Sequence, residues 1–267
     1  MPGSGAGVVS RTRALMRAGH PEPGLAVTGL TVALAAFAGL PAHRIAVLAV
    51  AVLSGQLLVG WTNDLIDVAT DREAGRDEKP LVGGTLRVRA VGSAVAVGGV
   101  VCAVFSLLCG PAAAAVHLLG VVAALLYNVG LKATVVSWVP YLVAFGSLPV
   151  AVGLTDRPTE LPPVWVVVVA GLLGVGAHLL NVYPDLEADA VTDVRGLPQR
   201  LGRRGIPVAT TVVMTAATAV AVVGAGMHLW HWIALAVVVA VSTLCRRAPL
   251  AVTVAIAAVD LAIVVTA

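Results

Sequence analysis

Residues 45–71 read IAVLAVAVLSGQLLVGWTNDLIDVATD, an apolar stretch that ends in a row of carboxylates. The apolar part has about the length that a helix needs to cross a bilayer. Asp64, Asp67 and Asp71 follow at offsets of three and four, so a continuing helix presents them on one face. Carboxylates at the end of a membrane span are costly unless they serve a cavity, an ion or a substrate. The stretch therefore predicts a membrane helix with a polar site at its end.

The composition of the whole chain is that of a membrane protein. Of its 267 residues, 59% are hydrophobic and 12% are charged, with a mean hydropathy of +0.97. The charged fraction is about half of that in soluble domains, which excludes an ordinary soluble domain, a disordered chain and a nucleic-acid-binding protein. The apolar runs are long and unbroken rather than short and alternating, so we expect an all-α polytopic membrane protein.

Nine apolar segments are candidates for transmembrane helices. They are 24–41, 45–66, 88–109, 112–130, 133–154, 163–184, 207–226, 228–245 and 248–266. Residues 1–20 contain no apolar core and are expected to form a flexible N-terminal arm. The remainder, 21–267, is expected to form a single transmembrane domain.

The basic residues indicate how the helices are oriented. If the N-terminus is cytoplasmic, 15 of the 17 lysines and arginines fall in cytoplasmic segments, and only Arg44 and Arg157 fall outside. We therefore expect an integral protein of the cell inner or plasma membrane, with its N-terminus and its aspartate-rich segments facing the cytoplasm.

A second acidic segment, NVYPDLEADAVTD at 181–193, repeats the first. Asn181, Asp185 and Asp189 align with Asn63, Asp67 and Asp71. The copy is incomplete, because a valine stands opposite the remaining aspartate of the first segment. An internal repeat with a ligand site between its halves is a recurring plan in membrane proteins.

The acidic and basic residues together suggest the class of ligand. Carboxylate oxygens suit Mg²⁺, which usually completes its coordination shell with phosphate oxygens. Basic residues follow both acidic segments and also occur between them: Arg72, Arg76, Lys79, Lys132, Arg195 and Arg200. Acids and bases beside a membrane-facing cavity suggest a diphosphate that carries an apolar tail.

At these residues the chain resembles the UbiA superfamily of intramembrane prenyltransferases. The resemblance rests on the motif N-D-x-x-D-x-x-x-D at 63–71, on Lys-Pro at 79–80, and on D-x-x-x-D at 185–189 with Arg-Leu-Gly at 200–202. Tyr-Asn at 127–128, Lys132 and Ser-Trp-Val-Pro-Tyr at 137–141 also look like family stretches. It covers about residues 20–267 and includes the nine-helix count.

The resemblance implies a helical bundle around a central cavity, with the aspartates at its cytoplasmic mouth. Mg²⁺ would be bound by Asp64, Asp67, Asp71, Asp185 and Asp189. Asn63 and Lys132 would join these aspartates as catalytic residues. The substrate would contact Arg72, Lys79, Tyr127, Asn181, Tyr183, Asp193, Arg195 and Arg200. For the tyrosines an interfacial anchoring role stays open, and for Asp193 a place in a surface loop.

The expected reaction is Mg²⁺-dependent ionisation of an isoprenoid diphosphate, with transfer of the prenyl group to a lipophilic acceptor of aromatic or quinone type. The alternative is a UbiA-type terpene cyclase, which uses no acceptor. A secondary transporter is disfavoured, because the carboxylates lie at one membrane face rather than at the midplane. Acceptor-using relatives often carry an arginine where this chain has His20 and Glu22, which argues against a carboxylated aromatic acceptor. Asp260, alone in the last apolar segment, has no role in this scheme.

Overall fold

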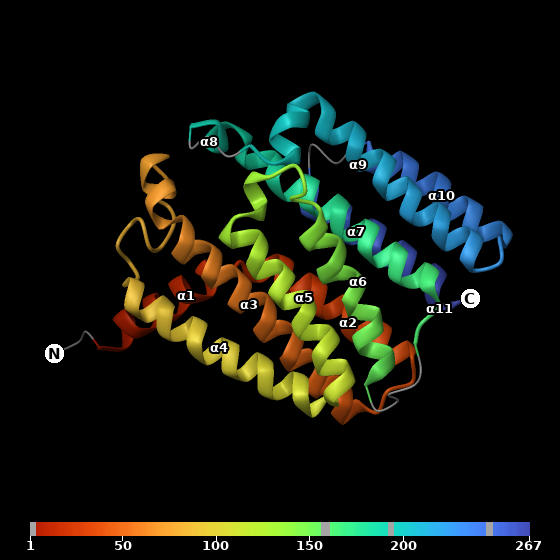
Figure 1. Cartoon of the computed structure of the whole chain (residues 1–267), viewed down its shortest axis with the longest axis horizontal. Helices are drawn as coiled ribbons and strands as arrows, with labels where there is room; N and C mark the ends of the chain where they lie inside the picture. Colours follow the sequence, from red (N-terminus) through yellow and green to blue (C-terminus); the bar gives the residue numbers. More distant parts are fainter. Residues whose placement is uncertain (1–3, 156–160, 192–194, 244–247) are drawn as a thin grey trace.

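The protein is all-helical in the part of the chain that the structure describes (Figure 1). The structure is a computed structural model that describes residues 4–155, 161–191, 195–243 and 248–267. Its helices are α1 (Ser4–Ala18), α2 (Pro21–Phe37), α3 (Ala42–Glu73), α4 (Val88–Leu108), α5 (Pro111–Val129), α6 (Val139–Leu154), α7 (Val164–Val182), α8 (Leu186–Val191), α9 (Leu197–Gly224), α10 (Leu229–Ser242) and α11 (Pro249–Val265). Short 3₁₀ turns lie at Leu131–Ala133 and Tyr183–Asp185.

The long apolar helices coincide with the segments predicted from the sequence. Among the described residues, five helices are long and apolar enough to cross a membrane, namely α3, α4, α5, α7 and α9. The helices α2, α6, α10 and α11 are apolar but shorter, at 10–17 residues. The all-α membrane fold is confirmed, whereas the count of nine spans stays a prediction.

Several helix boundaries differ from the predicted segments, for example α9, which begins at Leu197 rather than at 207, and two of the differences shape the polar end of the bundle. Helix α3 continues to Glu73 rather than ending at residue 66, so its aspartates lie on the membrane helix itself. Helix α6 begins at Val139 rather than at 133, because the 3₁₀ turn occupies Leu131–Ala133 and Pro140 fits best in a first helical turn. The residues between α5 and α6 are thereby free to face the aspartates of α3.

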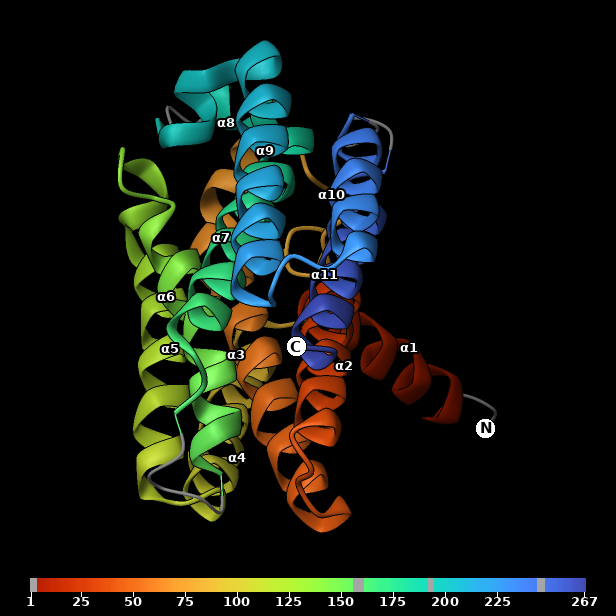
Figure 2. The same cartoon turned by 90° about the vertical axis from the view of Figure 1, so that its right-hand side faces the viewer.

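Seven of the described helices pack into a closed ring, and α4 and α10 lie outside it. Helices α2, α3, α5, α6, α7 and α9 pack in this order, and α11 contacts α2, α7 and α9 to complete the ring. Helix α4 packs outside on α3 and α5, and α10 packs outside on α9 and α11. Successive long helices alternate in direction, so the connections 74–87 and 130–138 and the residues 183–191 all lie at the same end (Figure 2).

Helix α1 projects sideways from the bundle, within the segment predicted as a flexible arm (Figure 2). Its last turns are held by burial of Ala14 and Ala18 and by a hydrogen bond of 2.9 Å from the Trp61 indole to the carbonyl oxygen of Leu15. The boundary between an N-terminal arm and the domain from residue 21 stays a prediction.

The joint between α1 and α2 rests directly on the backbone of α3. A Cβ atom on Gly60 would lie 2.4 Å from the carbonyl oxygen of Gly19, so only a glycine allows this approach. The next residue, His20, has a φ of 50°, a left-handed conformation that turns the chain into α2. The close contact therefore fixes where α2 begins and where the His20 side chain points.

Gly60→Ala should destabilise the protein, because the added methyl group forces the α1–α2 joint away from α3, an overpacking effect of about 1–3 kcal/mol. We expect a lower Tm for the variant in detergent, followed by circular dichroism. Gly92→Ala in α4 is the matched control, since a Cβ there meets nothing within 4 Å and alanine favours the helix. Equal Tm values for the two variants would contradict the close contact.

Candidate functional site

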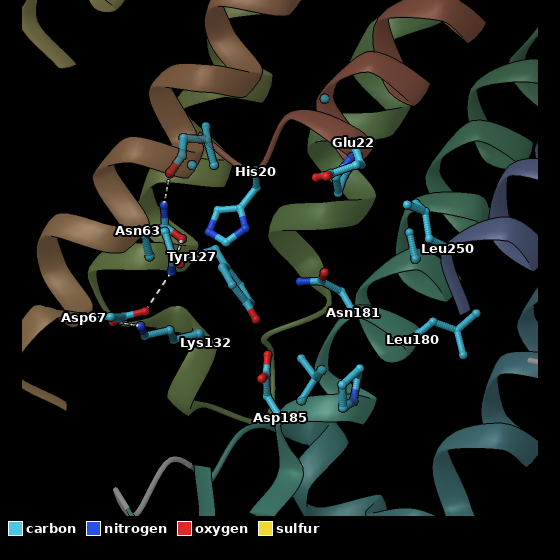
Figure 3. Close-up of a pocket in the computed structure, with 18 of the residues that line it drawn as sticks. His20, Glu22, Asn63, Asp67, Tyr127, Lys132, Leu180, Asn181, Asp185 and Leu250 are labelled. Atoms are coloured by element: carbon cyan, nitrogen blue, oxygen red, sulfur yellow. Dashed lines mark hydrogen bonds and ion pairs between the residues drawn. The ribbon is translucent and has the colours of Figure 1, made fainter. Parts of the chain in front are cut away.

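A cavity of about 690 Å³ opens at the end of the bundle where the loops 74–87 and 130–138 lie (Figure 3). One wall is polar and contains Asn63, Asp67 and Lys132, whereas Leu180 and Leu250 stand on the opposite side. The cavity is therefore amphipathic, with charged groups and apolar side chains facing the same space.

Helix α3 supplies the carboxylates of the polar wall. Asp67 and Asp71 both line the cavity, one turn apart on the extended end of the helix. The Asn63 side-chain amide donates a hydrogen bond of 2.8 Å to the Asp67 carboxylate. Lys132, in the 3₁₀ turn after α5, forms an ion pair with the same carboxylate. The acidic helix end and the basic turn, far apart in sequence, thus meet at one aspartate.

Asn128 joins α5 to α3 next to this pair. Its amide donates a hydrogen bond of 2.9 Å to the carbonyl oxygen of Val59, and its own oxygen lies 3.4 Å from the Asn63 amide nitrogen. Asn128 is buried and lines the cavity, but it was not among the predicted site residues. The Tyr-Asn stretch at 127–128 was the sequence signal that could have identified it.

Arg76 connects the two acidic segments. One guanidinium nitrogen lies 3.3 Å from Asp71 and the other lies 2.8 Å from Asp185, which follows α7 in the second 3₁₀ turn. The predicted internal repeat thus brings one aspartate from each half to a shared arginine. Arg76 was noted in the sequence as one of several bases, but its bridging position could not be read from sequence spacing.

Lys79 holds the remaining aspartate of α3. Its ammonium nitrogen lies 2.7 Å from Asp71 and 3.2 Å from Asp64, and the His20 ring nitrogen lies 3.3 Å from Asp64. Asp64 is only 2% exposed and does not line the cavity. Burial acts to lower the pKa of Lys79, but the hydrogen bonds and charges of Asp71 and Asp64 outweigh it and raise the pKa above its ordinary value. Lys79 therefore stays positively charged between its two carboxylates.

The second acidic segment contributes Asp185, Asp189 and Asn181 to the cavity. Gln199, at the start of α9, donates a hydrogen bond of 2.7 Å to Asp189. Burial raises the pKa of Asp189 and the nearby charge of Asp185 adds to this, whereas the hydrogen bond from Gln199 acts in the opposite direction. The charges of Arg76 and Lys132 also act to lower this pKa, but burial outweighs them.

Aromatic side chains form part of the cavity wall between its polar and apolar parts. Tyr127, Tyr141 and Phe145 line the cavity, and the Tyr127 and Tyr141 rings meet edge to face at 5.2 Å between centroids. His178 packs 4.8 Å from the Tyr141 ring and lies 3.0 Å from the Ser137 hydroxyl. Aromatic faces at this position can stabilise a cation.

Four of the predicted substrate-binding residues do not line the cavity: Arg72, Tyr183, Arg195 and Arg200. The Tyr183 ring instead lies under the Arg203 guanidinium at 5.8 Å, and Arg200 donates to the carbonyl oxygen of Arg195 at 3.1 Å. Asp193 lies outside the described residues.

The cavity carboxylates match a hard divalent cation in their chemistry. Asp67, Asp71, Asp185 and Asp189 all face one space, and carboxylate oxygens are the ligands that Mg²⁺ prefers. Within the described residues, however, no three acidic, histidine or cysteine side chains are arranged so that they could hold one ion. To bind Mg²⁺, these carboxylates must exchange their contacts with Arg76 and Lys132 for the metal.

Comparison with known proteins identifies the family. The chain matches the UbiA prenyltransferase family over residues 25–254. It belongs to this family. No protein of curated function matches it significantly. The family and the five apolar helices indicate an integral membrane protein.

Solved structures of UbiA homologues share the fold. One from Aeropyrum pernix K1, without ligand, superposes with a TM-score of 0.68 at 20% identity and covers 90% of this chain and 94% of its own. One from Archaeoglobus fulgidus, bound to GPP and Mg²⁺, superposes with a TM-score of 0.72 at 14% identity and covers 94% of this chain and 99% of its own. The structure of digeranylgeranylglyceryl phosphate synthase gives 0.63 at 15% identity over 96% of each chain. At these identities the likeness shows the fold alone.

Lys79→Met should destabilise the metal-free protein strongly, because it leaves Asp64 and Asp71 buried without their shared cation. Removing one partner of a buried ion pair costs on the order of 3–5 kcal/mol. We expect a clear drop in Tm, measured in detergent with EDTA. Arg203→Met is the matched control, because Arg203 and its partner Glu187 are 56% and 81% exposed and exposed pairs contribute little. Similar losses in both variants would contradict this assignment of the buried pairs.

Proposed function

We propose that the protein ionises an isoprenoid diphosphate in this cavity and transfers the prenyl group to a lipophilic acceptor. The observation that carries the proposal is the amphipathic cavity, in which matched aspartates from two halves of the chain and three basic side chains face an apolar wall. A diphosphate with an isoprenoid tail has the same division into a charged head and an apolar chain.

The bound state that we propose uses the carboxylates as metal ligands. Asp67, Asp71, Asp185 and Asp189 would hold Mg²⁺, with Asp64 next to them and fixed by Lys79. When bound, Mg²⁺ stabilises negative charge on the diphosphate as a Lewis acid. UbiA homologues solved with GPP and with DMAPP also contain Mg²⁺, which supports this part of the proposal.

The side chains of the cavity have distinct tasks in the proposed reaction. The bond between C1 and the bridging oxygen breaks, and its electron pair leaves with the diphosphate. Lys132 and Arg76, released from their aspartates, stabilise this charge together with Lys79, which exchanges its contact with Asp71 and keeps the one with Asp64. The allylic cation that remains is protected from water by the apolar wall and stabilised by the faces of Tyr127 and Tyr141. A new bond to the acceptor then forms, and the acceptor loses a proton.

We place the aspartates and the N-terminus on the cytoplasmic side of the membrane. The distribution of lysine and arginine supports this orientation. It also gives the charged head of the substrate access to the cavity from the aqueous side.

Cyclisation without an acceptor is the second candidate, and the aromatic side chains favour it. Tyr127, Tyr141 and Phe145 line one continuous part of the cavity. Aromatic faces along a cavity can stabilise a cation that moves along its own chain as well as one that waits for an acceptor. The same metal and diphosphate residues would serve both reactions.

Asp67→Asn and Asp185→Asn should each abolish diphosphate release from geranyl, farnesyl and geranylgeranyl diphosphate, because each removes a proposed metal ligand from one half of the site. Release is measured as pyrophosphate from the purified protein with Mg²⁺, and EDTA should stop it reversibly. Asp77→Asn is the matched control and should keep activity, because Asp77 is an exposed residue in the loop 74–87 that does not line the cavity. Substantial turnover in the Asp67 or Asp185 variant, or indifference to EDTA, would refute the metal assignment.

Product analysis distinguishes the two candidate reactions. The protein is incubated with each diphosphate and Mg²⁺ in detergent, first alone and then with phenol, quinone or lipid acceptors, and the organic extract is analysed by gas chromatography with mass detection. We expect a prenylated product only when an acceptor is present. A cyclic hydrocarbon or alcohol formed without acceptor, and absent in Asp67→Asn, would instead identify a terpene cyclase.

A further inference from the structure

A second, apolar pocket of about 110 Å³ lies beside the cavity, among α2, α6, α7 and α11. Val27 and Phe145 line both spaces, so the pocket adjoins the apolar wall of the main cavity. Its other walls are aliphatic side chains such as Leu173 and Ala257. The hydroxyl of Thr31, which also lines it, donates at 2.8 Å to the carbonyl oxygen of Val27 and is satisfied within its own helix.

Asp260 is the exception in this apolar pocket. It lies on α11, lines the pocket and is 1% exposed. Neither of its carboxyl oxygens has a hydrogen bond of good geometry to any described residue. Its polar neighbour is the Thr218 hydroxyl, which interacts weakly with the carboxyl and also donates at 3.3 Å to the carbonyl oxygen of Met214. A leucine would fill this position at lower cost, so Asp260 is expected to serve a ligand.

The contrast with the main cavity sharpens this argument. There, Asp64 and Asp71 are buried to a similar degree, and each has a lysine within 3.2 Å or less. Asp260 has no basic residue among its pocket neighbours. A buried carboxyl that the fold leaves with only a weak hydroxyl neighbour inside a pocket is suited to a partner that arrives with a ligand.

We propose that this pocket binds the prenyl acceptor, and that Asp260 forms a hydrogen bond to a hydroxyl or carbonyl oxygen of this hydrophobic molecule. Val27 and Phe145, which line both spaces, would then lie between the acceptor and the isoprenoid chain, and the reacting carbons would meet at this shared wall. The inference rests on the proposed function only in naming the ligand an acceptor, because binding to the pocket can be tested without any reaction.

The test uses two probes of nearly equal shape, 1-naphthol and 1-methylnaphthalene, which differ in the hydrogen-bonding group. Binding to the full-length protein in detergent is measured by titration calorimetry, without diphosphate. We expect the wild-type protein to bind 1-naphthol about tenfold more tightly, the size expected of one hydrogen bond. Asp260→Leu should lose this preference, and its Tm without ligand should rise because an unpaired buried acid has been removed. Equal binding of both probes by the wild type would overturn the proposal.

Thr210→Val is the matched control. The Thr210 hydroxyl is also buried without a partner among the described residues, but it does not line the pocket. This variant should keep the preference for 1-naphthol. Asp260→Ala repeats the test without added bulk if the leucine variant does not fold. A preference that survives in either Asp260 variant, or a lower Tm in both, would show that the carboxyl supports the fold rather than a ligand.

The outcome is separable from that of the proposed function. Diphosphate release that depends on Asp67, combined with equal binding of the two probes, would overturn the acceptor pocket and leave the proposed ionisation intact. A preference for 1-naphthol that depends on Asp260, without any diphosphate release, would support the pocket as a binding site. It would overturn the proposed reaction and, with it, the assignment of the ligand as a prenyl acceptor.

Discussion

Charge pairing at the mouth of the cavity is the constraint on which the arrangement of this structure depends. Carboxylates at the end of a membrane helix are costly unless each finds a counter-charge. Arg76, Lys79 and Lys132 supply those charges from two connections that are separated by the helical pair α4 and α5. The loop after α3 and the turn after α5 are therefore held over the cavity by the same groups that neutralise it.

The ring of helices separates this charged end from an apolar interior. Small residues allow the ring to close. A Cβ on Gly174 would lie 2.6 Å from the carbonyl oxygen of Tyr141, so α7 can approach α6 this closely only because residue 174 is a glycine. The close approach brings Tyr141 and Phe145 to the cavity wall. Helix packing and the chemistry of the wall are in this way decided by the same contact.

Local pattern was sufficient to predict the five long apolar helices and the two acidic segments, because hydropathy and helical spacing are properties of neighbouring residues. The bridge from Arg76 to Asp185 spans more than a hundred residues and depends on how α3 and α7 meet, which no local spacing encodes. The same holds for the contact between His20 and Asp64, and for the position of Asp260 in a pocket. Three of the predicted basic residues do not line the cavity, namely Arg72, Arg195 and Arg200. They are close in sequence to an aspartate, but closeness in sequence does not determine on which side of the aspartate a side chain lies.

The incomplete internal repeat has a physical explanation in these contacts. Asp67 and Asp71 face the cavity together with their counterparts Asp185 and Asp189, whereas Asp64 does not line it and is held by Lys79 and His20. The residue opposite Asp64 in the second half is Val182, which is 6% exposed. A buried aspartate at that position would need a counter-charge, which Lys79 and His20 supply to Asp64 in the first half. The repeat is therefore complete at the four carboxylates that face the shared cavity, and at the remaining position the aspartate held by Lys79 and His20 in the first half is replaced by an apolar side chain that lines the cavity in the second.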